Sequence, residues 1–116
     1  MKKIYLDYED YGIALSNLVK QIKRSRLKFN GVYGVPRGGA AIALHMSHNL
    51  NIPVLLYPTK DSLVVDDISD TGKTLMSHKN KKIATLYTTP WTKTKPDFSV
   101  LKKLEKDSWI IFPWEI

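Results

Sequence analysis

The stretch SLVVDDISDTGKT, residues 62–74, decides how this 116-residue chain is interpreted. Residues 63–65 are consecutive apolar side chains, a pattern typical of a strand that is covered on both faces of a parallel sheet. Two adjacent carboxylates, Asp66 and Asp67, follow directly, and a turn rich in hydroxyls comes next. Because parallel sheets bind ligands beyond the carboxyl ends of their strands, we expect a ligand site at this position.

The turn at Asp70, Thr71, Gly72, Lys73 and Thr74 predicts a phosphate-binding loop. Gly72 permits a tight turn, and the residues after it are expected to form a helix as far as about residue 78. Main-chain amides at the positive end of a helix bind phosphate, and the two hydroxyls and the lysine add further donors.

A P-loop of the nucleoside triphosphatase type is excluded by one position of this stretch. That motif requires a glycine five positions before its Gly-Lys pair, and here the position holds Asp67. A carboxylate at the base of a triphosphate cradle would repel the ligand.

The paired carboxylates indicate a ligand that carries hydroxyls as well as phosphate. Asp66 and Asp67 can accept hydrogen bonds from two neighbouring ribose hydroxyls, or hold waters around Mg²⁺. Chemistry alone therefore predicts a sugar phosphate, with its phosphate in the loop formed by residues 70–74. A simpler interpretation, in which Asp70 only caps a helix, explains that residue but not the adjacent pair.

The remaining pattern predicts a single α/β domain over residues 1–116, with a mostly parallel central sheet flanked by helices. Amphipathic or Ala-rich helices are expected at residues 10–26 and 40–50. Residues 96–107 are ambiguous: an extended segment is expected at 98–100, and one helical turn is considered after it. Strands are expected at residues 31–35, 53–57, 63–66, 83–88 and 109–112.

Composition limits the class of protein. The chain has no cysteine, which excludes disulfides and thiolate metal sites, and no apolar run of the roughly 18 residues that cross a membrane. We expect a soluble, cytoplasmic protein without a membrane partner. The net charge is +7. We interpret most lysines, including Lys102, Lys103 and Lys106, as solvated surface; attraction of phosphate ligands comes second, and nucleic-acid binding is not expected.

Two segments together resemble the type I phosphoribosyltransferase family. Residues 63–75 resemble its motif for phosphoribosyl pyrophosphate (PRPP), and residues 34–39 resemble its pyrophosphate loop. The resemblance implies that Arg37, Gly38 and Gly39 bind pyrophosphate together with Mg²⁺, and that the peptide between Pro36 and Arg37 is cis.

The C-terminal residues 107–115 resemble the ending of xanthine–guanine and related 6-oxopurine phosphoribosyltransferases. By this resemblance Trp109 stacks on the purine, the main chain near Ile110 reads the edge of the base, and Asp70 is the general acid or base at N7. Trp114 is expected to serve packing instead.

Two departures from the family pattern affect the expected activity. Thr89 stands where the relatives carry a lysine that holds the 6-oxo group, and Lys93 or Lys95 could replace it. Residues 58–62 form a connection too short to be the family's lid, so the chain could be slow, borrow a cover from a neighbouring subunit, or bind without turnover.

The resemblance implies a purine phosphoribosyltransferase that forms a nucleoside monophosphate and pyrophosphate from PRPP and a purine base. Mg²⁺ is the implied cofactor, and a homodimer or higher oligomer is the implied assembly. The alternative is a regulatory protein of the same fold that binds PRPP or nucleotides with little or no catalysis.

Overall fold

The computed structural model describes residues 1–116. Its α-helices are α1 Tyr8–Ser25 and α2 Gly38–Leu50, and it also has two short 3₁₀ helices, η1 Met76–His78 and η2 Pro113–Glu115. The strands are β1 Lys2–Tyr5, β2 Val32–Gly34, β3 Val54–Leu55, β4 Leu63–Ser69, β5 Lys82–Thr88, β6 Phe98–Lys102 and β7 Ser108–Ile111.

Five strands form a parallel sheet in the order β3-β2-β4-β5-β6, which confirms the predicted fold class. Strand β4 is central, and Val65 pairs with Gly34 of β2 on one side and Ala84 of β5 on the other. The segments that follow β2 and β4 therefore leave the same edge of the sheet side by side, as ligand sites in such sheets require.

The first helix is stabilised at both ends by its sequence. The Asp7 carboxylate accepts a hydrogen bond from the Asp10 amide at 2.8 Å, so α1 begins before residue 10, where the sequence predicted its start. Lys23 and Arg24 lie in the last turn, where positive charge suits the helix dipole. Neither helix combines the length and hydropathy needed to span a bilayer.

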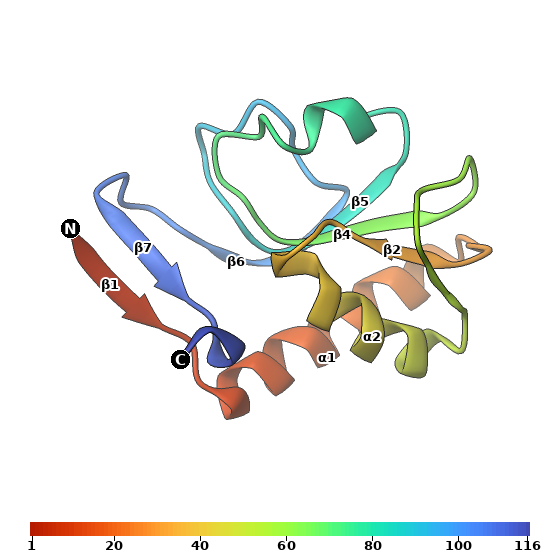
Figure 1. Cartoon of the computed structure of the whole chain (residues 1–116), viewed down its shortest axis with the longest axis horizontal. Coiled ribbons are helices and arrows are strands. Elements are labelled where there is room, and N and C mark those ends of the chain that lie inside the picture. The colour runs from red at the N-terminus through yellow and green to blue at the C-terminus, as the bar shows by residue number, and fades with distance from the viewer.

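The two faces of the sheet are covered differently. Figure 1 shows α1 and α2 on one side, where they cover the main core, and the 3₁₀ helix η1 on the other. A smaller cluster of Val35, Val64, Leu75 and Ile83 fills that second side.

The helix expected from Thr71 or Gly72 to about residue 78 is wrong, because only η1 is helical there. The residues between β4 and β5 must first form the loop at 70–75. Those that remain suffice for one tight turn before the chain returns to the sheet.

A second, two-stranded parallel sheet joins the two ends of the chain. β1 pairs with β7 in the register Ile4 to Ile110, and Figure 1 shows this pair beside the far end of the main sheet. The sequence predicted β7 but not β1, a short strand whose pattern is mostly polar. The helical turn considered for residues 96–107 is absent, and β6 extends to Lys102.

The burial of α1 predicts a sharp contrast between two of its aliphatic residues. Leu18 is fully buried and Ile13 is 58% exposed, although both fit the helical spacing. We expect Leu18→Ala to lower the free energy of unfolding by about 2–5 kcal/mol and Ile13→Ala to change it by less than about 0.5 kcal/mol. Urea unfolding followed by circular dichroism measures both, and similar losses would contradict the observed orientation of the helix.

Candidate active site

A crevice of about 200 Å³ lies at the carboxyl end of β4 and is lined entirely by residues 66–75. Strand β4 runs to Ser69, beyond the predicted end at Asp66, so Asp67 also lies within the strand and not after it. The residues predicted to bind ribose and phosphate thus line one cavity.

The loop at 70–75 is held by its carbonyl groups. Thr89 Oγ1 donates to the Asp70 carbonyl at 2.6 Å, the Lys93 amide to the Thr71 carbonyl at 2.9 Å, and Thr94 Oγ1 to the Gly72 carbonyl at 2.7 Å. Residues 89–94, hereafter the 89–94 segment, therefore fix three consecutive carbonyls of the loop on one side.

The amides of the same loop remain free. Those of Thr71, Gly72, Thr74 and Leu75 donate no hydrogen bond within the protein. Gly72 has φ +85, and a Cβ there would lie 2.6 Å from Thr92 Oγ1, so only glycine suits the position. Concave sets of free amides bind anions, although here no long helix adds its dipole.

Three side chains of the loop are available to a ligand as well. Thr71, Lys73 and Thr74 are all exposed. The only hydrogen bond among them is a long one, 3.4 Å, from the Lys73 amide to Thr71 Oγ1. The loop thus offers amides, hydroxyls and an ammonium group to the same crevice.

Asp66 is a buried carboxylate and Asp67 a partly buried one, and both have few partners. Each accepts a hydrogen bond of 2.8 Å from the amide of the next residue. Burial, and then the neighbouring Asp67, raise the pKa of Asp66 to about 8, and burial also raises the pKa of Asp67. The pair is therefore costly to ionise in the free protein and suited to a ligand that donates hydrogen bonds.

The segment after β2 packs directly on this pair. The peptide between Pro36 and Arg37 is cis, as the resemblance implied, and both residues are exposed. A Cβ on Gly38 would overlap the Asp67 carboxylate, and one on Gly39 would overlap the Val65 carbonyl. The glycines thus allow the predicted pyrophosphate loop to contact the predicted ribose site.

A second cavity of about 230 Å³ adjoins the crevice and shares Asp67, Ile68 and Asp70 with it. Trp109, 55% exposed, and the buried Ile110 both line it, as predicted for a base site. The remaining lining residues are Lys103, Phe112 and Glu115.

Trp114, in contrast, packs within the protein. Its ring stacks on Phe112 at 5.4 Å between centroids and meets the edge of Tyr11 at 5.0 Å. The expectation that this tryptophan serves packing is confirmed.

The residues expected to contact the 6-oxo group do not line this second cavity, and a different lysine does. Thr89 does not line the cavity, and its hydroxyl is engaged by the loop. Lys93 and Lys95 are exposed and lie outside the cavity lining. Lys103, expected at the solvated surface, is instead only 5% exposed and forms an ion pair of 2.6 Å with Asp70.

Asp70 has both carboxylate oxygens occupied. Trp91 Nε1 donates to Oδ1 at 2.8 Å and Lys103 Nζ to Oδ2 at 2.6 Å. Sequence reasoning missed both donors. The one available signal was the alternation of β6, which directs Lys103 and Lys102 to opposite faces.

The connection between β3 and β4 covers neither cavity. Thr59 and Ser62 bond to each other, with the Thr59 amide 2.9 Å from Ser62 Oγ, and the Asn30 amide donates to the Asp61 carbonyl. Because Asn30 precedes β2, these contacts lie at the opposite edge of the sheet from the crevice. The site therefore remains open.

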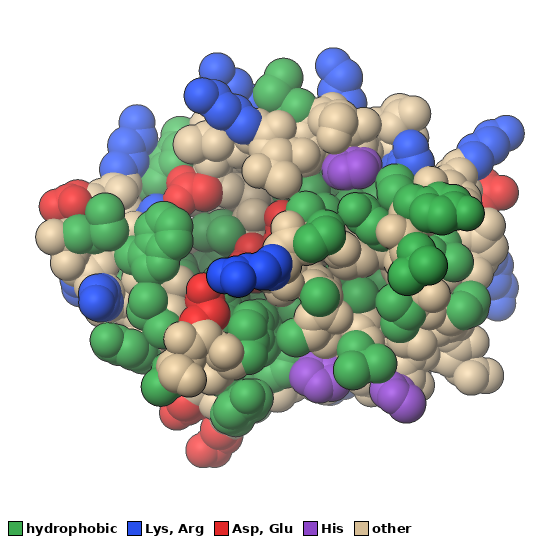
Figure 2. Space-filling model, viewed as in Figure 1, with side chains coloured by type: hydrophobic (Ala, Val, Ile, Leu, Met, Phe, Trp, Pro, Cys, Tyr) green, Lys and Arg blue, Asp and Glu red, His purple; other side chains and the backbone are tan.

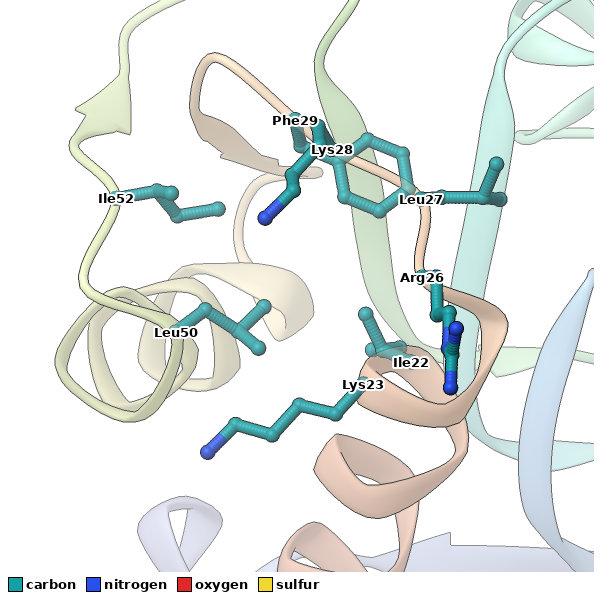
Figure 3. Close-up of a pocket in the computed structure, with 8 residues that line it drawn as sticks. All are labelled: Ile22, Lys23, Arg26, Leu27, Lys28, Phe29, Leu50 and Ile52. Atoms are coloured by element: carbon teal, nitrogen blue, oxygen red, sulfur yellow. The ribbon is translucent and has the colours of Figure 1, made fainter.

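The largest cavity, about 500 Å³, lies elsewhere, between the ends of the two helices. Figure 3 shows the aliphatic side chains of Ile22, Leu50 and Ile52 around it, with Lys23 and Lys28 nearby. It contains no carboxylate or hydroxyl side chain, so it lacks the groups that the predicted ligand requires.

Charge is distributed unevenly over the face seen in Figure 2. Most lysine and arginine side chains project singly from its edges, and several acidic side chains lie nearer the middle and left. This arrangement favours the solvated interpretation of most lysines over a continuous nucleic-acid surface.

The carbonyl contacts of the loop yield a stability prediction. Thr94→Val removes the donor to the Gly72 carbonyl and leaves a buried acceptor unpaired, so we expect the free energy of unfolding to fall by about 1–3 kcal/mol. Thr88→Val is the matched control, because Thr88 Oγ1 is buried without a partner and its loss should be neutral or stabilising. Equal losses in urea unfolding of the two variants would contradict this account of the loop.

The raised pKa of Asp66 predicts that replacing this residue increases the free energy of unfolding by an amount that depends on pH. Between its ordinary value of 3.8 and about 8, the folded chain holds a proton that the unfolded chain releases, so stability falls as pH rises through this window. Asp66→Asn keeps the acceptor for the Asp67 amide and removes this penalty. We expect the free energy of unfolding of this variant to exceed that of the wild type by about 0.5–2 kcal/mol near neutral pH, and the difference to grow with pH across the window. Melting curves at several pH values test it, and a pH-independent difference would count against it.

Known proteins were compared with this chain. No family model matches it. A curated xanthine-guanine phosphoribosyltransferase from Idiomarina loihiensis is 26% identical, with 99% of this chain and 88% of the relative covered. Their alignment spans 147 positions, so about 30 have no counterpart in this shorter chain, which fits the short β3–β4 connection.

Two solved structures share the fold over nearly their full length. The Helicobacter pylori xanthine-guanine-hypoxanthine phosphoribosyltransferase has a TM-score of 0.79 and 25% identity, covering 98% of this chain and 94% of that one. The purine phosphoribosyltransferase from Pyrococcus horikoshii has a TM-score of 0.83 and 32% identity, covering 100% and 95%. With this similarity over the whole chain, the chain belongs to the type I phosphoribosyltransferase family.

Proposed function

We propose that this protein transfers the phosphoribosyl group of PRPP to a purine base, forming a nucleoside 5′-monophosphate and pyrophosphate. The observation that carries the proposal is the wall shared by two cavities, in which Asp67, Ile68 and Asp70 face both the crevice and the base cavity. A sugar phosphate and a base bound there lie next to each other, as the transfer requires. The names of the similar proteins support the same reaction class.

The crevice offers hydrogen-bond donors to the phosphate of the phosphoribosyl group and acceptors to its ribose. The free amides of Thr71, Gly72 and Thr74 bind the 5′-phosphate, assisted by the Lys73 ammonium group. Asp66 and Asp67 accept hydrogen bonds from the ribose hydroxyls, which also compensate for the burial of these carboxylates.

The pyrophosphate of PRPP lies against Arg37, Gly38 and Gly39, where main chain can approach closely and a guanidinium group can bind two oxygens. The donor set fits Mg²⁺ that arrives with this substrate. Mg²⁺ in phosphate sites is held by one or two carboxylates together with substrate oxygens, and Asp66 and Asp67 supply that part. The ion would neutralise charge on the pyrophosphate as it leaves.

In the transfer, the bond between the anomeric carbon and the pyrophosphate oxygen breaks, and its electron pair leaves with pyrophosphate. A ring nitrogen of the base donates the pair that forms the new bond to the same carbon and gives up its proton. Asp70 lies between the two cavities and is the candidate acid or base for the purine. Trp109 supplies a flat ring on which the base can stack.

Product analysis tests this function. The protein is incubated with Mg²⁺, PRPP and hypoxanthine, guanine, xanthine or adenine in turn, and nucleoside monophosphate is measured by chromatography. We expect product with at least one base, and a loss of about 100-fold or more in the double variant Asp66→Asn/Asp67→Asn. Asp61→Asn is the matched control, because this exposed acid lies at the opposite edge of the sheet.

The alternative is a regulatory protein that binds PRPP or nucleotides without catalysis. The open crevice is compatible with it, but the similar proteins do not favour it, because they are phosphoribosyltransferases by name. Calorimetry with PRPP and nucleotides separates the two functions. Binding of PRPP without product from any base would leave the regulatory function and end the enzymatic one. The implied homodimer or higher oligomer is tested in the same preparation by sedimentation.

A further inference from the structure

Lys103 is a buried cation whose neighbours do not satisfy it fully. Its side chain is 5% exposed, although it follows the end of an edge strand, β6. Its amide donates to the Thr88 carbonyl at 2.9 Å, which fixes the main chain at this point. Its ammonium group makes one hydrogen bond within the protein, to Asp70 Oδ2 at 2.6 Å.

An ammonium group carries three donors and no acceptor, so two donors of Lys103 have no acceptor in the protein. Buried charged groups are costly unless they are paired and hydrogen bonded. Lys103 lines the base cavity, and the free donors therefore belong to a ligand that brings acceptor oxygens.

We infer that Lys103 determines which base is accepted, by selecting purines that present a carbonyl oxygen to it. This inference rests on the proposed function and assigns the selection to a residue at the end of β6, since Thr89 is engaged by the loop and Lys93 and Lys95 lie outside the cavity. Asp70 and, through it, Trp91 hold the ammonium group in place.

The selection follows from the donors and acceptors of the purines. Hypoxanthine, guanine and xanthine carry a carbonyl oxygen at position 6, which accepts from an ammonium group. Adenine carries an amine there. The amine and the Lys103 ammonium group are both donors, so neither can pair with the other. Sites built to hydrogen-bond one group reject the analogue that lacks it. The size of the cavity, about 230 Å³, is below that of pockets for drug-sized ligands and suits a single base.

The test compares inosine and adenosine 5′-monophosphates, which share the ribose phosphate and differ in the group at position 6. Ribose 5-phosphate reports on the crevice alone. Dissociation constants are measured by calorimetry for the wild-type protein, Lys103→Met and Lys102→Met. The last is the matched control, because Lys102 is the exposed neighbour on the opposite face of β6.

We expect wild-type protein to bind the inosine nucleotide about 10- to 100-fold more tightly than the adenosine nucleotide, a range typical of one hydrogen bond to a charged group. Lys103→Met should abolish this ratio and should weaken the inosine nucleotide more than ribose 5-phosphate, which feels only the loss of the partner of Asp70. Lys102→Met should preserve both the ratio and the binding of ribose 5-phosphate.

Three outcomes would overturn the assignment. Equal affinities of the wild-type protein for the two nucleotides would do so without any variant. A Lys103→Met protein that keeps the ratio would also do so, as would one that weakens both nucleotides and ribose 5-phosphate equally, since that indicates a structural role alone. If the wild type selects neither nucleotide but still binds ribose 5-phosphate and forms product, the proposed function stands and only this inference fails.

Discussion

The candidate site depends on the orientation of one short loop. Three carbonyls, those of Asp70, Thr71 and Gly72, are bonded to the 89–94 segment, so the amides between them are left for a ligand. A main chain that satisfied its own amides could not bind phosphate this way. The 89–94 segment therefore determines the conformation of the crevice, although it does not line it.

The same crevice combines two features that oppose stability. The amides are unpaired, and the buried carboxylate of Asp66 lies beside the partly buried one of Asp67. Sites prepared for a charged ligand often carry such costs in the free protein. The main core compensates on the other side of the sheet, where α1 and α2 bury their apolar faces against β4 and β5.

Sequence reasoning succeeded where a local pattern carries the information. The apolar runs located β2, β4 and β5, and the acids and the single glycine of residues 66–74 located the crevice. It failed where a partner far along the chain decides the outcome. Strand β1 exists because β7 pairs with it, and Lys103 is buried because Asp70 lies opposite; neither partner can be read from the residues nearby. The prediction of a helix after Gly72 was wrong because the loop takes up the residues that the helix would need.

The short connection between β3 and β4 has a consequence for the fate of the reaction. Leu56 and Tyr57 both project into solvent, 90% and 71% exposed, and no residue of this connection lines the crevice or the cavity beside it. In the proposed transfer, water would then compete with the base as the attacking group, and the products would be divided between nucleotide and free ribose 5-phosphate. In that reaction the share transferred to the base would depend on how completely the base fills the cavity that Trp109 lines, so the acceptor itself would govern the yield.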